Sequence, residues 1–350
     1  KNNIKVSKNF TSIHQAERIA KKLIRQGTFN WLNSGAESGF TSDINIEDLK
    51  RIQLIPRILT KNNKLNLNSN FFKVNINNPL ILCPMGHQTQ FHPSGERATA
   101  AALNKGGHLG FFSTQGRTSF DILRNKNPNT DLVYQIFPFG DKNWIMKEIK
   151  RAEKNKSRAL SFCFDAPVRS HRHLDRETNY DARKYGKGKP ISQDPSYALN
   201  YDWEFIKWVK SKTSLKIIPK GLISIDDIKS SVKYGCDAIW ISNHGGRMFN
   251  SGISCSRVLN NLRKKTKIKI PIIVDGGVRQ GTDIIKYMCL GANFVGIGRP
   301  AIFGLIIDGQ RGVERIFSIL IQELKAAMLN GGFKTIKEMD YKRLDFSEEF

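Results

Sequence analysis

Short apolar stretches rich in β-branched and aromatic residues recur along the chain, with helix-like segments between them. Eight of them are predicted to be strands: 79–83, 108–114, 131–137, 159–165, 216–221, 238–244, 271–277 and 294–300. Their first residues are 22 to 57 positions apart. Because every interval leaves room for a crossover helix, parallel pairing is favoured. The pattern predicts an α/β protein with a closed (β/α)8 TIM barrel.

Helix signals fill the intervals between these strands and continue beyond both ends of the barrel. Segment 95–104 is rich in alanine, and Ser224 opens a helix over 225–234 that Gly235 ends. A helix before the barrel has one apolar face, formed by Ala16, Ile19, Ala20, Leu23 and Ile24. A helix after the barrel ends at Gly331 and has an apolar face formed by Val313, Ile316, Phe317, Leu320, Ile321 and Leu324. We expect both to pack on the barrel exterior.

We interpret residues 1–350 as a single domain. It comprises an N-terminal helical extension (1–78), the barrel (79–310) and C-terminal helices (311–350). The longest interval between strands contains a polar insertion with glycine and proline, residues 166–200, directly after the fourth strand. This insertion lies on the face where barrel active sites form, so it is either a lid or a surface loop.

Composition excludes several classes of protein. With 39% hydrophobic residues the chain is too apolar to be disordered, and no apolar run reaches the roughly 18 residues of a membrane span. The first 26 residues are polar and lack the apolar core of a signal peptide. The five cysteines are odd in number and form no C-x-x-C motif, so we expect reduced structural thiols and no metal site. These features predict a cytoplasmic protein.

The formal net charge of +25 is the one extreme value. The basic residues are dispersed and have no aromatic residues interleaved among them, so no nucleic-acid partner is expected and a solvated lysine-rich surface is favoured. An acidic protein or peptide partner, a small carboxylate and peripheral contact with an anionic membrane remain open.

Polar and charged residues gather where the last five predicted strands end: Asp165, Lys220, Ser242, His244, Arg247, Asp275, Arg279 and Arg299. The carboxyl ends of parallel barrel strands meet at one mouth, so these residues are predicted to form one site. Gly276, Gly277 and Gly298 allow backbone N–H groups to approach an anion closely, and Arg279 and Arg299 add positive charge. The last two loops therefore predict a phosphate cradle.

The sequence resembles the FMN-dependent α-hydroxy-acid oxidases and dehydrogenases, which include glycolate oxidase, lactate oxidase and L-lactate dehydrogenase. The resemblance rests on the stretch from Ser242 to Arg247 and on that from Asp275 to Asp283, and it continues to Gly298-Arg299-Pro300. Further matches are Ser34-Gly35-Ala36, His92-Pro93 and Asp165-x-Pro167. The resemblance covers nearly the whole chain. The resemblance implies an FMN-binding barrel enzyme that oxidises a 2-hydroxy acid to the 2-oxo acid, commonly as a tetramer.

Carried over residue by residue, the resemblance implies the following roles. His244 is the catalytic base, Asp165 holds its imidazole, and Lys220 faces the N1/C2 edge of FMN. Arg247 and Arg172 clamp the substrate carboxylate. The implied cofactor residues are Pro84, Met85, Gly86, Ser113, Gln135, Cys163, Lys220, Ser242, Asp275, Gly276, Gly277, Arg279, Gly298 and Arg299. Cys163 stands where a threonine is usual.

The departures from the family pattern concern the substrate. Two tyrosines that touch substrate in the family correspond to Phe29 and Phe137, and an aromatic position corresponds to Gln115. Losing a hydroxyl donor to a bound anion removes on the order of 1.5–3 kcal/mol per bond. The pocket therefore accepts a different or larger substrate, oxidises lactate-like acids slowly, or has lost the reaction. The intact base, carboxylate and arginines argue against loss.

Two alternatives keep part of this interpretation. In one, the flavin enzyme acts on a peptide-bound or carrier-protein-bound group that an acidic partner delivers to the basic surface. In the other, the barrel is only a scaffold for a basic binding protein, which leaves the set of His244, Arg247 and Lys220 unexplained. His171 and His173 flank Arg172 and either contact a substrate group or are exposed loop residues.

Overall fold

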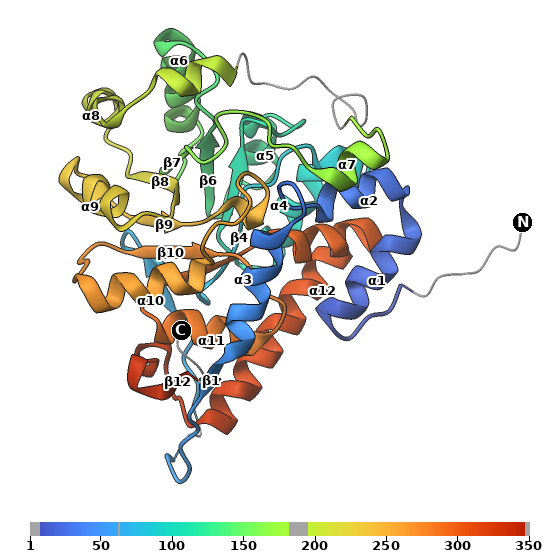
Figure 1. Ribbon diagram of the computed structural model, residues 1–350, viewed down its shortest axis with the longest axis vertical. Coiled ribbons are helices and arrows are strands. Elements are labelled where there is room, and N and C mark those ends of the chain that lie inside the picture. The colour runs from blue at the N-terminus through green and yellow to red at the C-terminus, as the bar shows by residue number, and fades with distance from the viewer. Residues whose placement is uncertain (1–7, 62–63, 182–194, 347–350) are drawn as a thin grey trace, which may run out of the picture.

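Eight parallel strands close into a barrel in the computed structural model, which describes residues 8–61, 64–181 and 195–346 (Figure 1). Their order around the barrel is β10-β11-β4-β5-β6-β7-β8-β9. The strands are β4 (Leu80–Leu82), β5 (Gly110–Ser113), β6 (Leu132–Ile136), β7 (Leu160–Cys163), β8 (Ile217–Leu222), β9 (Ile239–Ile241), β10 (Ile272–Asp275) and β11 (Phe294–Ile297). The predicted TIM barrel is confirmed, and each strand lies within its predicted range except that β8 extends one residue further.

Helices occupy the intervals between the strands. They are α4 (Gly95–Gly106), α5 (Phe120–Lys126), α6 (Lys142–Lys154), α8 (Trp203–Lys212), α9 (Ile225–Lys233), α10 (Cys255–Lys265), α11 (Gly281–Cys289) and α12 (Arg299–Gly331). Most begin at a polar cap whose side chain accepts a hydrogen bond from a backbone N–H of the first turn: Ser119, Asp141, Asp202, Ser224 and Ser254. These caps fix where each helix begins after its strand.

The N-terminal part contains strands as well as the expected helices. The helices α1 (Ile13–Leu23), α2 (Gln26–Asn33) and α3 (Phe40–Arg51) are followed by β1 (Ile52–Leu54) and by a hairpin of β2 (Ser69–Phe71) and β3 (Val74–Ile76). Helix α1 packs against α12, which also contacts α4 and α11 (Figure 1). Both outer helices therefore lie on the barrel exterior, as predicted.

Helix α12 is longer than the predicted C-terminal helix because it begins directly after β11. It carries a break at Asp308 and Gly309, where the backbone leaves helical geometry, so the boundary drawn at 310 falls inside this helix. The helix ends at Gly331, as predicted, and Gly332 caps it, because Gly332 adopts φ 72° and its N–H bonds to Leu329 O. The short 3-10 turns η5 (Ile336–Glu338) and η6 (Tyr341–Arg343) precede β12 (Leu344–Phe346), which pairs antiparallel with β1.

Side chains fill the interior of the barrel and close its amino end. Phe71 of the hairpin packs edge-on against Phe111 of β5 and Phe294 of β11, at centroid distances of 6.2 and 5.5 Å. Trp240 lies above them, 4.6 Å from Phe111. With the bottom and centre packed in this way, the open end is the mouth formed by the carboxyl ends of the strands.

The insertion after β7 is described in part. Helix α7 (His173–Glu177) contacts α2, and the 3-10 turn η3 (Pro195–Asn200) leads into α8. Residues 182–194 of the predicted lid (166–200) lie outside the described residues. Within the described ranges, no helix is both long and apolar enough to cross a bilayer. The five cysteines are unpaired and buried, as expected of structural thiols.

Candidate active site

A cavity of about 540 Å³ opens at the carboxyl ends of the strands. Its volume falls within the roughly 300–1,000 Å³ typical of small-molecule sites. Among its lining residues are Pro84, Met85, Gly86, Gln115, Phe137, Arg172, Lys220, His244, Arg247, Asp275, Gly276, Gly277, Arg279, Gly298 and Arg299, all of them predicted site residues. The loops that were expected to meet therefore do meet at one mouth.

Lys220 is the hub of a polar network at this mouth, with Ser242, Asp275 and Asp165 around its ammonium group. Its Nζ donates to Ser242 Oγ at 2.7 Å, and Asp275 Oδ2 lies 3.5 Å away. Ser242 donates in turn to Asp275 Oδ1 at 3.0 Å, and Trp240 Nε1 donates to Asp275 Oδ2 at 2.9 Å. Burial alone would lower the pKa of Lys220, but Asp275 and Asp165 outweigh it and hold that pKa above its ordinary value. Lys220 is therefore a fixed buried cation.

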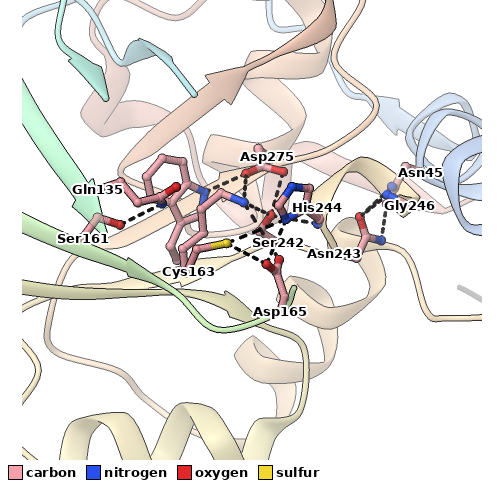
Figure 2. A network of polar contacts seen from close by, with 12 residues as sticks. Asn45, Gln135, Ser161, Cys163, Asp165, Ser242, Asn243, His244, Gly246 and Asp275 are labelled. Atoms are coloured by element: carbon pink, nitrogen blue, oxygen red, sulfur yellow. Dashed lines mark hydrogen bonds and ion pairs between the residues drawn. The ribbon is translucent and has the colours of Figure 1, made fainter. Parts of the chain in front are cut away.

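His244 is held by Asp165 through a hydrogen bond of 2.9 Å between imidazole Nδ1 and carboxylate Oδ1 (Figure 2). A carboxylate can only accept, so Nδ1 carries the proton and Nε2 presents its lone pair. Burial alone would raise the pKa of Asp165, but the neighbouring His244 and Lys220 outweigh that effect and hold it well below its usual value. The arrangement is an ionised carboxylate that orients the imidazole of His244.

The backbone of the β9 loop brings His244 into this position. His244 and the following Gly245 and Gly246 adopt φ values of 57°, 63° and 74°. Asn243 secures the turn by accepting from Gly246 N at 3.2 Å and by exchanging side-chain hydrogen bonds with Asn45 at 2.9 Å (Figure 2). The left-handed turn explains the two glycines after the histidine, because glycine tolerates that conformation without strain.

Cys163, at the end of β7, lies beside the same pair. Its Sγ donates to Asp165 Oδ1 at 3.0 Å and lies 3.8 Å from His244 Nδ1. Burial, with Asp165 nearby, raises the pKa of this thiol well above its usual value. Cys163 is therefore a protonated neighbour of the imidazole.

The loops after β10 and β11 form the predicted cradle. Gly276 and Gly277 have φ values of 115° and 78°, and a Cβ on Gly277 would lie 2.2 Å from the backbone oxygen of Asn45. Any other residue at position 277 would collide with α3. Gly298 precedes the N-terminus of α12, and Pro300 lies in the first turn of that helix. Such a helix start favours an anion.

Arg279 and Arg299 supply positive charge beside the cradle. Arg299 donates to the backbone oxygens of Leu32 at 3.1 Å and Gly245 at 3.0 Å, which ties α12 to the last turn of α2 and to the β9 turn. Burial, reinforced by Arg279, lowers the pKa of Arg299 to about 10. Because burial disfavours the charged form of Arg299, an anion bound in the cradle would stabilise that charged form.

Arg247 and Arg172 gather around Trp31. Arg247 lies 4.8 Å and Arg172 lies 5.7 Å from the indole centroid. Arg247 Nη1 also donates to the backbone oxygens of Trp31 and Leu32 at 2.6 and 2.8 Å, while Arg172 pairs with Asp175 at 3.1 Å. Burial, with Arg172 and Arg299 nearby, lowers the pKa of Arg247 well below its usual value. Both guanidinium groups are preorganised at the cavity wall.

One predicted position, Phe29, has different surroundings from those expected. Phe29, expected to touch substrate, does not line the cavity; it is buried and stacks on Phe303 at 6.4 Å. Residues two apart on a helix point about 200° apart, so when Phe29 faces the core, Trp31 faces the cavity. Trp31 was not predicted as a site residue, although the helical periodicity of α2 places it on the face opposite to Phe29.

Five more predicted residues lie beneath or beside the cavity and are not among its lining residues: Ser113, Gln135, Cys163, Asp165 and Ser242. Gln135 donates to Ser161 Oγ at 3.1 Å, and Ser113 Oγ accepts from Gln115 N at 3.0 Å. They are buried polar groups that support the residues above them. Phe139, Val168, Arg169 and Met248 line the cavity and were not predicted.

The charge of the lining fits an anionic cofactor and an anionic substrate. Six basic side chains (Arg169, Arg172, Lys220, Arg247, Arg279 and Arg299) face two acidic ones (Asp181 and Asp275) among the described residues that line the cavity. A phosphate at the cradle and a carboxylate near Arg247 would compensate this excess. The residues present therefore fit FMN, with its phosphate held by Arg279, Arg299 and the glycine turns.

The barrel therefore brings an imidazole held by a carboxylate, a buried lysine and two groups of arginines to one mouth. Comparison with known proteins defines the family. The family model described as FMN-dependent dehydrogenase matches residues 20–345. The chain therefore belongs to the FMN-dependent dehydrogenase family, and it is an FMN-binding oxidoreductase acting on CH–OH donors.

Individual relatives agree with this assignment. L-lactate oxidase of Lentilactobacillus hilgardii is 31% identical over 350 residues, covering 96% of this chain and 94% of the relative. Glycolate oxidase 3 of Arabidopsis thaliana is 30% identical over 347 residues, covering 94% of both chains. A crystal structure of mandelate oxidase with 3,3-difluoro-2-hydroxy-3-phenylpropionic acid superposes with a TM-score of 0.89 at 25% identity, covering 96% of this chain and 98% of that chain.

Proposed function

We propose that this enzyme oxidises a 2-hydroxy acid with an apolar side chain larger than that of lactate to the corresponding 2-oxo acid, with His244 as the catalytic base. The observation that carries the proposal is the base itself: a histidine whose Nδ1 is tied to Asp165 and which lines a cavity with arginines on its wall.

The proton transfer follows from the tautomer. Because Nδ1 donates to Asp165, Nε2 of His244 is the atom that accepts the proton of the substrate hydroxyl. The imidazole then becomes cationic, and Asp165, 2.9 Å away and ionised, stabilises that charge. Histidine bases contribute roughly 10²–10⁴-fold to rate in such positions.

The arginines orient the substrate. Arg247 and Arg172 present guanidinium groups on one wall of the cavity that His244 also lines, so a carboxylate held there would bring the neighbouring carbon toward the imidazole. The glycine turns with Arg279 and Arg299 would hold the phosphate of FMN, and Lys220 would face the ring. FMN, when bound, accepts the two electrons that leave the substrate carbon.

Apolar side chains that line the cavity support the proposed substrate class. Phe137 lies 6.2 Å from the His244 ring and 5.3 Å from Phe139. These rings, with Val168 and Met248, offer apolar contact and no hydroxyl donor. Burying an apolar side chain there contributes about 25 cal/mol per Å². A longer aliphatic or an aryl substituent gains more from this wall than the methyl group of lactate.

An anaerobic titration tests the proposal. The FMN-loaded enzyme is mixed with lactate, 2-hydroxyhexanoate, 3-phenyllactate and mandelate, and the flavin absorbance near 450 nm is followed. Faster bleaching by the larger acids supports the proposal. Equal or faster bleaching by lactate would contradict the size preference. If the flavin of the His244→Gln variant is still bleached at the normal rate, His244 is not the base.

The remaining expectations are also proposals. A cytoplasmic location and a homo-oligomer, a tetramer by family resemblance, are proposed, and sedimentation velocity tests the assembly. The alternative of a carrier-bound or peptide-bound substrate delivered by an acidic partner is not favoured, because the relatives are named for small hydroxy acids. Turnover of the natural substrate that is lost above about 0.15 M salt, with turnover of free acids unaffected, would favour the partner instead.

A further inference from the structure

Three side chains with metal-binding atoms converge at one edge of the mouth. Cys163 Sγ, an Asp165 carboxylate oxygen and His244 Nδ1 all lie within 4.8 Å of one another (Figure 2). They come from the end of β7, the loop after it and the loop after β9. From this convergence we infer that the enzyme binds Zn²⁺ through Cys163, Asp165 and His244, as an inhibitory site.

The separations between the three atoms suit zinc. They are 3.0 Å from Cys163 Sγ to Asp165 Oδ1, 3.8 Å from Cys163 Sγ to His244 Nδ1, and 2.9 Å from His244 Nδ1 to Asp165 Oδ1. A point equidistant from all three lies roughly 1.9 Å from each, so an ion about 1 Å out of their plane reaches the 2.0–2.3 Å of zinc bonds. The ligands need to move little.

The ligand chemistry selects the metal. Thiolate, imidazole and carboxylate together are a zinc donor set, whereas Mg²⁺ and Ca²⁺ take oxygen ligands. Asp165 also has a ligand atom to spare, because its Oδ2 is buried without a hydrogen-bond partner in the described part of the chain. His244, one of the three ligands, lines the cavity, so a water molecule in the cavity could supply the fourth ligand.

The charges balance when the thiol gives up its proton. The S–H bond of Cys163 breaks, a Zn–S bond forms, and one proton goes to solvent, so Zn²⁺ meets one thiolate and one carboxylate. Lys220, 4.0 Å from Asp165 Oδ2, opposes the ion, but Asp275 at 3.5 Å from the same ammonium offsets that repulsion. No electrons are transferred.

The consequence for activity rests on the proposed function. Nδ1 of His244 carries the proton shared with Asp165, and a zinc ion on Nδ1 leaves the imidazole with its single proton on Nε2. The lone pair that would accept the substrate proton is then lost. Zinc bound here therefore stops proton abstraction even while FMN remains bound.

Zinc X-ray absorption of the FMN-loaded enzyme with one equivalent of ZnCl₂ tests the site. We expect one sulfur neighbour at about 2.3 Å and nitrogen or oxygen neighbours at about 2.0–2.2 Å. Cys163→Ser should lose the sulfur neighbour and raise the Kd for zinc more than roughly tenfold. Cys163→Thr is the second variant should the serine protein fold poorly. Cys236→Ser, a buried thiol elsewhere, should keep the sulfur neighbour.

Absence of a sulfur neighbour in the unaltered enzyme, or its survival in Cys163→Ser and Cys163→Thr, overturns the site. Turnover is measured in parallel, each variant relative to its own rate without zinc, with MgCl₂ as the control salt. Zinc should inhibit the unaltered enzyme and Cys236→Ser but spare Cys163→Ser. A sulfur-ligated zinc that leaves turnover intact keeps the metal site and overturns the base role of His244 instead.

Discussion

Arg247 lies with its guanidinium 4.8 Å from the centroid of the Trp31 ring, and it also donates to the backbone oxygen of Trp31 at 2.6 Å. Arg172 approaches the same ring at 5.7 Å. One aromatic side chain thus positions both candidate carboxylate ligands. Trp31 acts through the arginines, so its removal should weaken substrate binding more than it slows the chemical step.

Trp31→Leu should therefore raise KM for the substrate about 5- to 30-fold, corresponding to the loss of roughly 1–2 kcal/mol of cation–π interaction. The kcat value should change much less. Steady-state kinetics on the acid that bleaches the flavin fastest would measure both. Trp31→Phe keeps an aromatic face, so its KM should be close to that of the unaltered enzyme. An unchanged KM in Trp31→Leu would contradict the positioning role.

A second prediction compares two phenylalanines that the sequence could not tell apart. Phe137→Tyr places a hydroxyl beside His244 and should raise kcat/KM for lactate by about tenfold or more, since a hydrogen bond to an anion contributes roughly 1.5–3 kcal/mol. Phe29→Tyr is the matched control. Its hydroxyl enters the contact with Phe303, so it should cost about 1–3 kcal/mol of unfolding free energy without a gain for lactate.

Removing a positive charge from the cradle should weaken FMN binding, whereas removing one elsewhere on the surface should not. Arg279→Gln should raise the Kd for FMN roughly 10- to 100-fold, because hydrogen bonds to a charged phosphate contribute about 1.5–3 kcal/mol. Fluorescence titration of the apoprotein with FMN measures this. Arg158→Gln removes an exposed arginine that pairs with Asp131 and should leave the Kd unchanged. Equal effects of the two substitutions would mean that overall charge, and not the cradle, holds FMN.

His108 predicts a pH dependence of stability. It is buried, stacks on Phe317 at 4.5 Å and accepts from Asn78 through Nδ1, and burial lowers its pKa to about 4 from 6.5. Between these two values the unfolded chain binds a proton that the folded chain does not. The unfolding free energy should therefore fall as pH drops from 6.5 to 4, by at most about 1.4 kcal/mol per pH unit, and His108 contributes no slope above that window.

Urea unfolding at pH 7, 6, 5 and 4 measures this slope. His108→Gln should reduce it but not abolish it, because burial also lowers the pKa of His87 to about 4, whereas His14→Gln, at an exposed position, should leave it unchanged. If both variants keep the slope of the unaltered protein, proton uptake by His108 is not its cause.

Much of the barrel could be predicted because its signals are local. A fully buried strand such as β4 is a continuous apolar run, and crossover lengths imply parallel pairing. The strands β1 and β12 escaped prediction because they pair only with each other, and the pairing of Ile52 with Phe346 joins positions far apart in the chain. No window of sequence contains that contact.

Within the site, residues at strand ends were predictable and residues on the covering elements were not. Asp165, Lys220 and His244 lie at or just beyond the carboxyl ends of apolar strands. A closed barrel brings all of these strand ends to one mouth. Trp31 depends on the rotation of α2, and Phe139 on the path of a loop. Small shifts along a helix or loop move a side chain from core to cavity, so Phe29 was expected at the cavity where Trp31 lies.

The pairing of β1 with β12 has a consequence for biosynthesis. Ile52 leaves the ribosome early, but its partner Phe346 emerges only after the whole barrel has been translated. The phosphate cradle is completed late as well, since Arg299 begins α12. A nascent chain therefore exposes the apolar edges of its first strands until β11 reaches β4. Chaperone dependence during translation should accordingly exceed that of a protein with mainly local contacts.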